Sequence, residues 1–285
     1  MSLPADLGII FLARDRYSTA EFSLQAVLSD AARSGAKPHV YIADPGYSAE
    51  HVSSLHDIAL ANDADATFID VGKYATTNHA WNEVYRGIAE ERVLCLENDV
   101  NMQPGCLGIL LPLIASEKKY QIFAPAVYEP DGVTPHFRPT VASIDRLAGS
   151  GTRVELDRGR SEKGDSEGVT RPIDIFERHC FLMSRASALA IGDWDELMFC
   201  RTDLDLSLAC HAAGLHAALV EAATVQLSGE GLEQEDVAFY DYRWNEHRVM
   251  RSNERLIAKW QLIGYKRTVN HVKDSRKRLS AFGLS

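Results

Sequence analysis

A short apolar run that ends in three polar residues limits what this chain can fold into. Residues 93–96 read Val-Leu-Cys-Leu, and Glu97, Asn98 and Asp99 follow directly. Four apolar residues without alternation are typical of a strand covered on both faces, as in the parallel sheet of an α/β domain. Such sheets bind ligands at the carboxyl ends of their strands. The run therefore predicts a buried strand whose acidic end faces a binding site.

The two acids of this stretch are spaced to bind one cation. Residues two apart on an extended strand project to the same side, so Glu97 and Asp99 point together while Asn98 turns away. Hard cations such as Mg²⁺ or Mn²⁺ take one or two protein carboxylates and complete their shell with phosphate and water. A strand followed by an acidic turn without a ligand is the alternative, and these residues alone do not decide between the two.

Apolar strands and amphipathic helices alternate along the first hundred residues. Strands are predicted at 7–12, 39–43, 67–71 and 93–96, and helices at 19–33, 49–62 and 78–91. This order implies an α/β fold with a doubly wound parallel sheet. The sequence contains neither G-x-G-x-x-G after the first strand nor G-x-x-x-x-G-K-[ST], which argues against dinucleotide oxidoreductases and P-loop enzymes.

The second half of the chain contains a long irregular segment and a helical end. Residues 146–171 are mainly Gly, Ser, Thr and charged, which predicts a mobile loop of the kind that closes over substrates, although a disordered insertion is equally compatible. Three helical patterns follow residue 236. We therefore divide the chain into a domain of residues 1–230 and a helical C-terminal appendage of residues 231–285.

The charge distribution limits the partners. The net charge is −10, but residues 243–285 carry eleven Lys or Arg against three Asp or Glu, a local +8 that leaves −18 for residues 1–242. So acidic a body argues against nucleic acid as a partner. The basic tail suits peripheral contact with an anionic membrane surface, an acidic partner or the body itself, and a solvated helical face is the alternative. An oligomer is compatible with the sequence.

Nothing in the sequence indicates a membrane span or a secretory leader. No stretch approaches the roughly 20 consecutive apolar residues that a span needs, and residues 1–6 lack a basic region followed by an apolar one. We therefore expect a cytoplasmic protein. The five cysteines form no C-x-x-C pair, so buried free thiols are expected instead of disulfides or a zinc site.

With these motifs in place, residues 7–229 resemble family 2 glycosyltransferases of the GT-A fold. Gly192 to Leu206, GDWDELMFCRTDLDL, is similar in order and spacing to the family block G-G-F-D-E…E-D-x-D-L. Glu97-Asn98-Asp99 looks like the family's D-x-D motif with its first aspartate changed to glutamate. The resemblance implies a Rossmann-like, mostly parallel sheet flanked by helices. It also implies a metal-dependent, inverting transfer of a sugar from a nucleotide-diphosphate donor to a hydroxyl acceptor.

The resemblance further implies roles for single residues. Asp99 would be the firmer ligand of Mn²⁺ or Mg²⁺ on the donor diphosphate, and Glu97 would assist as a ligand or act through water or the ribose. Asp203 falls on the aspartate that acts as general base. A carboxylate suits that role because an acceptor hydroxyl must lose its proton as it attacks.

The same resemblance assigns three donor-binding positions. Arg14 would line the base pocket and Asp44 would contact the base or ribose. Asn82 stands fifteen residues before Glu97, like the second residue of an R-N pair in the family, with Trp81 in place of the arginine. His179 precedes an apolar strand, where it contacts either substrate or the protein core.

Two alternatives to a glycosyltransferase stay open. The first is a nucleotidyltransferase on a similar fold, which is disfavoured because the Gly-rich basic loop usual after its first strand is absent. The second is a relative that binds a nucleotide or glycan without turning it over. Glu97, Thr202 and Gln226 support it, because each departs from the family residue at its motif position. The donor base, the sugar and the acceptor depend on loop shapes that the sequence does not specify.

Overall fold

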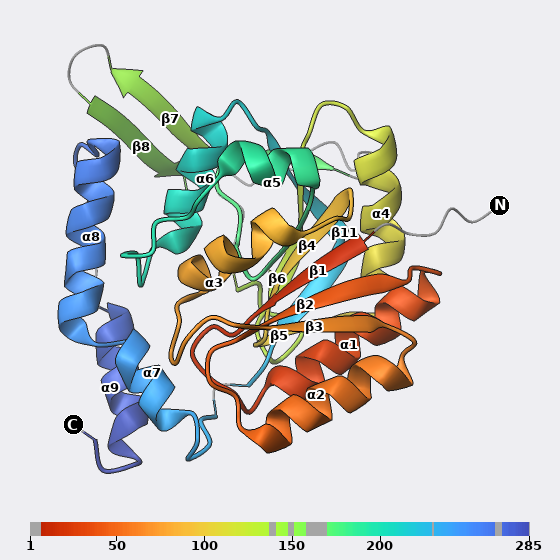
Figure 1. Cartoon of the computed structure of the whole chain (residues 1–285). Helices are drawn as coiled ribbons and strands as arrows, with labels where there is room; N and C mark the ends of the chain where they lie inside the picture. Colours follow the sequence, from red (N-terminus) through yellow and green to blue (C-terminus); the bar gives the residue numbers. More distant parts are fainter. Residues whose placement is uncertain are drawn as a thin grey trace.

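The computed structural model describes residues 7–136, 141–147, 151–157, 170–229, 231–265 and 270–284, and within them a curled, mostly parallel sheet lies between helices (Figure 1). Its strands, in chain order, are β1 (Leu7–Leu12), β2 (Pro38–Asp44), β3 (Asp65–Asp70), β4 (Arg92–Glu97), β5 (Val100–Met102), β6 (Ile122–Tyr128), β9 (Arg171–Ile173), β10 (Cys180–Ser184) and β11 (Ala217–Leu227). They lie in the order β3-β2-β1-β4-β10-β6-β11-β5, and β9 pairs with β11.

Helices cover both faces of this sheet. The first face carries α1 (Ala20–Arg33), α2 (Ala49–Ala61) and α4 (Cys106–Ser116), and the second carries α3 (Thr77–Val84), α5 (Arg185–Ile191) and α6 (Thr202–Ala212). Because successive side chains of a strand point to opposite faces, Ile9 and Phe11 of β1 pack on the first layer and Ile10 and Leu12 on the second. All five cysteines are buried and free, as the sequence predicts.

The carboxyl ends of three parallel strands meet at one edge of the sheet. β1 pairs in parallel with both β2 and β4, and Leu12 lies opposite Glu97. β10 then pairs with β4 in the antiparallel sense, with Cys180 opposite Leu96. The residues that precede β10 therefore lie beside those that follow β4, which places segments 177–179 and 97–99 at the same edge.

The element boundaries differ most from the prediction at the start of β3 and at the end of α3. β3 begins two residues earlier than expected, and the predicted helix over 78–91 ends at Val84 in a single 3₁₀ turn, Tyr85–Gly87. The strand β11 is continuous, although its register against β6 shifts between Val220 and Thr224. A bulge at this point explains why the apolar pattern is interrupted without ending the strand.

Part of the predicted loop over 146–171 has regular structure. β7 (Val141–Leu147) and β8 (Gly151–Asp157) pair as an antiparallel hairpin that projects beside α8 (Figure 1). Thr152 joins it to the C-terminal region, since its N–H donates to the carbonyl of Gln261 over 3.0 Å. Residues 158–169 lie outside the described residues, and the predicted closure over substrate is untested.

The C-terminal region consists of α7 (Val237–Arg243), α8 (Glu246–Trp260) and α9 (Asn270–Ser280), gathered on one side of the molecule (Figure 1). Part of its positive charge binds the body, because Arg255 Nε lies 2.7 Å from Asp195 and Lys259 Nζ lies 2.8 Å from Asp205. None of the described helices combines the length and apolar character needed to cross a membrane. The division into two domains near residue 230 stays a prediction.

Candidate active site

Asn98 fixes the acidic stretch to the loop after β1. Its backbone N–H donates to the carbonyl of Leu12 over 2.8 Å, and its Nδ2 donates to the carbonyl of Arg16 over 2.7 Å. Its Oδ1 accepts from the N–H of Arg14 over 3.0 Å. The amide side chain is fully buried, and both its oxygen and its nitrogen bind the backbone of the loop after β1. The carboxylates on either side of Asn98 are left to face other groups.

Glu97 is a buried carboxylate clamped by Arg178. Arg178 Nη2 donates to Glu97 Oε1 over 2.6 Å, and the same guanidinium reaches Asn78 Oδ1 over 2.6 Å and the hydroxyl of Thr77. Burial opposes ionisation of the carboxyl, but the positive charges of Arg178, His179 and Arg14 together outweigh it and hold the pKa of Glu97 below its usual value. Glu97 is therefore ionised at neutral pH and held in one orientation.

Asp99 faces the guanidinium of Arg14. Arg14 Nη1 donates to Asp99 Oδ2 over 3.1 Å, and Arg14 Nε lies 3.8 Å from Glu97 Oε2. The other oxygen of Asp99, Oδ1, is buried and has no hydrogen-bond partner among the described residues. Burial disfavours the charged form of Arg14, but Asp99 and then Glu97 raise its pKa above the usual value. A permanent positive charge therefore lies between the two acids.

His179 completes the cluster from the opposite strand. Its Nε2 contacts Arg14 Nη1 and lies 3.6 Å from Glu97 Oε2, while its Nδ1 lies 2.6 Å from Glu177 Oε1. Burial and the charge of Arg14 lower the pKa of His179, but Glu177 and Glu97 together outweigh them and raise it above 6.5. A histidine whose second ring nitrogen faces a carboxylate is the usual arrangement around a bound metal.

The donor atoms of this cluster fit a divalent cation. One ligand atom from each of Glu97, Asp99 and His179 lies within 4.8 Å of the others, and all three residues are buried. Two carboxylates and an imidazole suit Mn²⁺, and Mg²⁺ accepts the carboxylates. The unpartnered Oδ1 of Asp99 is the buried acceptor that such an ion would satisfy. Because Arg14 already pairs with Asp99, the ion and the guanidinium of Arg14 compete for that carboxylate.

His136 belongs to a second group that shares the same histidine. His136, Glu177 and His179 also bring ligand atoms within 4.8 Å of one another. The ring of His136 lies edge-on to that of His179, with centroids 5.4 Å apart, and its Nδ1 lies 2.8 Å from Glu129. The polar edge of the sheet therefore extends from Asp99 to the turn that follows β6.

Asp203 lies in the first turn of α6, near enough to Glu177 for the two carboxylates to repel each other. Burial, followed by repulsion from Glu177, raises the pKa of Asp203, and Arg201 opposes this shift. Arg201, which precedes α6, adopts a left-handed backbone conformation with φ of 56°, which is uncommon for a residue with a side chain. A carboxylate with a raised pKa is suited to accept a proton.

Asn82, which the resemblance assigns to donor binding, makes its hydrogen bonds to the segment that precedes α6. Its Nδ2 donates to the carbonyl of Trp194 and to Glu196 Oε1, both over 2.9 Å, and its Oδ1 accepts from the N–H of Trp194 over 2.8 Å. The indole of Trp194 stacks on Trp81 with ring centroids 4.3 Å apart. In this structure Asn82 holds the segment before α6 against α3, and its hydrogen-bonding atoms are used there.

Asp44 lies at the expected edge, and its carboxylate shapes the turn after β2. Its Oδ1 accepts from the N–H groups of Gly46 and Tyr47 over 2.8 and 2.7 Å. Gln226, which departs from the residue that the resembling family has at this motif position, donates to the carbonyl of Pro130. The structure thus brings Arg14, Glu97 and Asp99 into contact, whereas Asp44, Asn82 and Gln226 make their hydrogen bonds to other groups.

Arg243, at the end of α7, lies near the site and was not predicted from the sequence. Its side chain is buried, and neither Nε nor Nη1 has a hydrogen-bond partner within the described part of the chain. Burial and the nearby Arg14 lower the pKa of Arg243 to about 10, so the guanidinium stays charged at neutral pH. The next residue, Trp244, donates from Nε1 to Asp15 Oδ2 over 2.8 Å. An unsatisfied cation therefore faces the acidic edge.

Glu177 and Arg178 were also missed. A charged triplet, Glu177-Arg178-His179, stands immediately before the apolar strand β10, just as Glu97-Asn98-Asp99 follows β4. Both triplets can be seen in the sequence, but they are brought to the same edge of the sheet only because β10 runs antiparallel to β4.

No protein-family model matches this sequence, and no curated protein is similar to it by sequence. Solved structures do share its fold. A crystal structure of GalNAc-T7 with UDP, GalNAc and Mn²⁺ has a TM-score of 0.58 at 12% identity, covering 96% of this chain and 54% of that one, so this chain spans about half of that protein's length. The mannosyltransferase PcManGT from Pyrobaculum calidifontis, in complex with GDP-Man and Mn²⁺, has a TM-score of 0.56 at 13% identity, covering 98% and 74%. The inositol-1-phosphate CTP transferase from T. maritima reaches a TM-score of only 0.48 at 10% identity, covering 86% and 98%.

These similarities confirm the predicted fold class. The mixed α/β architecture is that of GT-A glycosyltransferases. At 12 and 13% identity they show the fold alone, and membership of family 2 in particular stays a prediction.

Proposed function

We propose that this protein is a metal-dependent, inverting glycosyltransferase that moves a sugar from a nucleotide-diphosphate donor to a hydroxyl acceptor. The observation that carries the proposal is the convergence of Glu97, Asp99 and His179 at the carboxyl edge of the sheet, with ligand atoms within 4.8 Å of one another. The GT-A structures that resemble this chain hold Mn²⁺ together with UDP or GDP-Man, which supports Mn²⁺ and a nucleotide-sugar as ligands here.

The residues around the cluster are suited to hold a diphosphate. A bound cation would neutralise the negative charge that develops on the leaving group. Arg178 keeps Glu97 oriented through its 2.6 Å hydrogen bond. Arg243 offers two buried nitrogens without a hydrogen-bond partner in the described residues, and guanidinium groups pair readily with phosphate oxygens. When Arg14 leaves Asp99, its own charge becomes available to the donor as well.

Asp203 is the proposed general base. It takes the proton of the acceptor hydroxyl while the hydroxyl oxygen forms a bond to the anomeric carbon and the bond from that carbon to the diphosphate breaks. The raised pKa of Asp203, caused by burial and by Glu177, strengthens it as a proton acceptor. A single displacement of this kind inverts the anomeric centre and requires no covalent enzyme intermediate.

A second candidate is a relative that binds a nucleotide or glycan without catalysis. It is favoured by the pairing of Arg14 with Asp99, because a chain that never binds a metal would keep that ion pair permanently. Thr202 and Gln226 stand where the resembling family carries glutamate and histidine. A nucleotidyltransferase is the remaining alternative.

Nucleotide binding followed by a transfer assay tests the proposal. We expect UDP, GDP or dTDP to raise the melting temperature in the presence of Mn²⁺ and to have little effect in EDTA. The matching nucleotide-sugar should then release nucleoside diphosphate when an acceptor panel is added. Binding without turnover would favour the non-catalytic relative, whereas incorporation of a nucleoside monophosphate from a triphosphate would identify a nucleotidyltransferase.

A further inference from the structure

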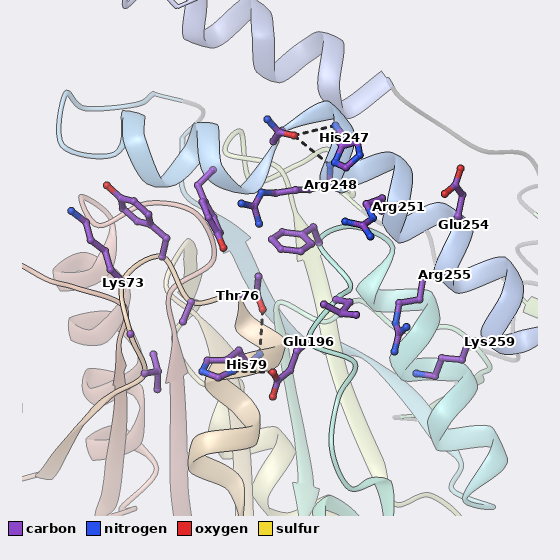
Figure 2. A pocket seen from close by; sticks show the side chains of 18 of the residues that line it. Lys73, Thr76, His79, Glu196, His247, Arg248, Arg251, Glu254, Arg255 and Lys259 are labelled. Atoms are coloured by element: carbon purple, nitrogen blue, oxygen red, sulfur yellow. Dashed lines mark hydrogen bonds and ion pairs between the residues drawn. The ribbon is translucent and has the colours of Figure 1, made fainter.

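A cavity of about 1320 Å³ lies between the end of β3 and the C-terminal helices (Figure 2). The loop over 71–76 forms one wall, residues from 196 to 199 form the floor, and α8 forms the other wall. Binding pockets for small molecules usually measure roughly 300–1,000 Å³. The cavity is therefore large enough for a substrate bigger than a single sugar.

The cavity carries an excess of positive charge. Its described lining residues include five Lys or Arg and two Glu. Arg255 and Lys259 are paired with Asp195 and Asp205. Lys73, Arg248 and Arg251 have no carboxylate partner among the described residues, and Figure 2 shows Lys73 on the loop side and both arginines on α8. Three uncompensated cations thus surround one space.

Two of these cations, Lys73 and Arg248, make cation–π contacts with aromatic rings. The guanidinium of Arg248 lies 3.8 Å from the ring centre of Tyr242 and 5.0 Å from that of Phe199. Lys73 Nζ lies 4.9 Å from the ring centre of Tyr74. Stacking on aromatic faces positions a guanidinium and leaves its hydrogen-bond donors free for an anion. The same rings offer apolar surface to the rest of a ligand.

This space is distinct from the acidic cluster. Thr76 and His79 line the cavity, whereas Thr77 and Asn78 turn to the other side of α3 and bind Arg178, the partner of Glu97. Residues three apart on a helix share a face, so the start of α3 separates the two sites. A phosphate bound by Lys73 and Arg251 would therefore differ from the diphosphate proposed beside Asp99.

The cavity adjoins the segment that carries the proposed base. Glu196, Leu197 and Phe199 line it, and the chain continues through Arg201 into α6, which begins at Thr202. α8 is anchored to this helix, because Trp260 Nε1 donates to Asp205 Oδ1 over 2.7 Å. A molecule in the cavity thus lies against the segment leading to Asp203, where an acceptor must approach.

We propose that the cavity is the acceptor site and selects acceptors that carry a phosphate group, bound by Lys73, Arg248 and Arg251. The assignment to the acceptor rests on the proposed glycosyltransferase function. A phosphate monoester or diphosphate carries enough negative charge for three cations, and arginine forks match its oxygens. The phosphate of a bound donor nucleotide has the same chemistry, and the experiment separates these two sources.

Calorimetric titration of this chain tests the proposal. Glucose 6-phosphate and pyrophosphate serve as phosphate probes and glucose as the neutral control, all in EDTA so that no metal site contributes. Arg251→Gln is the main variant because Arg251 is exposed and its loss disturbs no contact of the fold. Lys73→Gln tests the opposite wall, and Arg33→Gln, an exposed arginine on α1, is the matched control.

We expect the phosphate probes, and not glucose, to bind wild-type protein with an affinity that falls as salt is added. Loss of one phosphate-binding cation should weaken each probe about tenfold, which corresponds to roughly 1.4 kcal/mol. Arg33→Gln should change nothing. Failure of both probes to bind, or binding that Arg251→Gln and Lys73→Gln leave unchanged, overturns the proposal.

Parallel titration of UDP, GDP and dTDP with Mn²⁺ identifies the source of the phosphate. Nucleotide affinity within about twofold of wild type in both variants supports an acceptor phosphate, whereas an equal loss for nucleotide assigns the cavity to the donor and overturns the acceptor site. If nucleotides do not bind while the probes still depend on Arg251, the glycosyltransferase function fails and the phosphate site stands.

Discussion

Arg14 Nη1 donates to Oδ2 of Asp99 over 3.1 Å and at the same time contacts Nε2 of His179. One guanidinium therefore occupies the groups that are best suited to bind a divalent cation. The resting protein keeps its buried acids neutralised by its own side chain, and metal binding is an exchange of one cation for another.

Asp99→Asn should abolish metal binding. The amide keeps the size of the side chain but removes the charge on which a hard cation depends. We expect Mn²⁺ affinity to fall more than about 100-fold, beyond the range found when groups supporting a ligand are removed, and the nucleotide-dependent rise in melting temperature to disappear. Calorimetry and thermal shift measure these effects, with the exposed Asp57→Asn as control. A full nucleotide shift in Asp99→Asn would remove Asp99 from the metal site.

Arg14→Ala should raise the affinity for Mn²⁺. The variant removes the cation that competes for Asp99 and Glu97, so Mn²⁺ titrated alone should bind more tightly than to wild type. Thermal stability without metal should fall, because the buried Asp99 loses its ion-pair partner while Glu97 keeps Arg178, and Mn²⁺ should restore it. Weaker Mn²⁺ binding in this variant would show that Arg14 supports the site instead of competing for it.

Asp203→Asn should retain donor binding and lose transfer. Removing a general base typically lowers the rate about 10²- to 10⁴-fold, while UDP or GDP affinity with Mn²⁺ should match wild type. The base must be deprotonated, and the pKa of Asp203 is raised. Transfer by the wild type should therefore increase as pH rises through that pKa, above the ordinary 3.8, and the variant should lack this limb. A pH-rate profile with the same limb in both proteins would assign it to another group.

Protonated His51 should fasten the C-terminal region to the body. Its Nδ1 lies 2.6 Å from Glu21 and its Nε2 lies 3.0 Å from Glu235. Burial lowers the pKa of His51, but the two glutamates outweigh it and raise the net value above 6.5. The added stability is thus full below the unfolded pKa near 6.5 and is lost as pH rises through the higher folded pKa. Urea unfolding from pH 5 to 9 should show this loss in wild type and not in His51→Gln.

Asp236→Ala should destabilise the junction between α7 and the loop after β1. The buried carboxylate accepts from the N–H groups of Tyr17 and Ser18 over 2.7 and 3.1 Å and from the hydroxyl of Ser18 over 2.6 Å. Leaving these donors unpaired should lower the free energy of unfolding by about 3 kcal/mol, measured in urea. Asp241→Ala, which removes only a partly exposed pair with Arg276, should change it by less than about 1 kcal/mol.

The local pattern of the sequence was enough to predict the sheet and its acidic edge. An uninterrupted apolar run is typical of a strand buried on both faces, and the alternation of such runs with amphipathic helices predicts that β1, β2 and β4 are parallel. The side-chain alternation of a strand likewise directs Glu97 and Asp99 to one side.

Only the tertiary structure decided what those acids meet. Glu97 pairs with Arg178, 81 residues later, and Arg14 contacts His179, 165 residues later, because β10 inserts antiparallel beside β4. The contact of Asn82 with Trp194 and the position of Arg243 on α7 near the site likewise depend on how distant segments pack. Periodicity reports which face of an element is apolar, whereas the partners across that face depend on how distant segments pack together. The local sequence was therefore enough to predict Asp99 as a metal ligand, whereas the contact of Arg14 with His179 beside it depends on the fold.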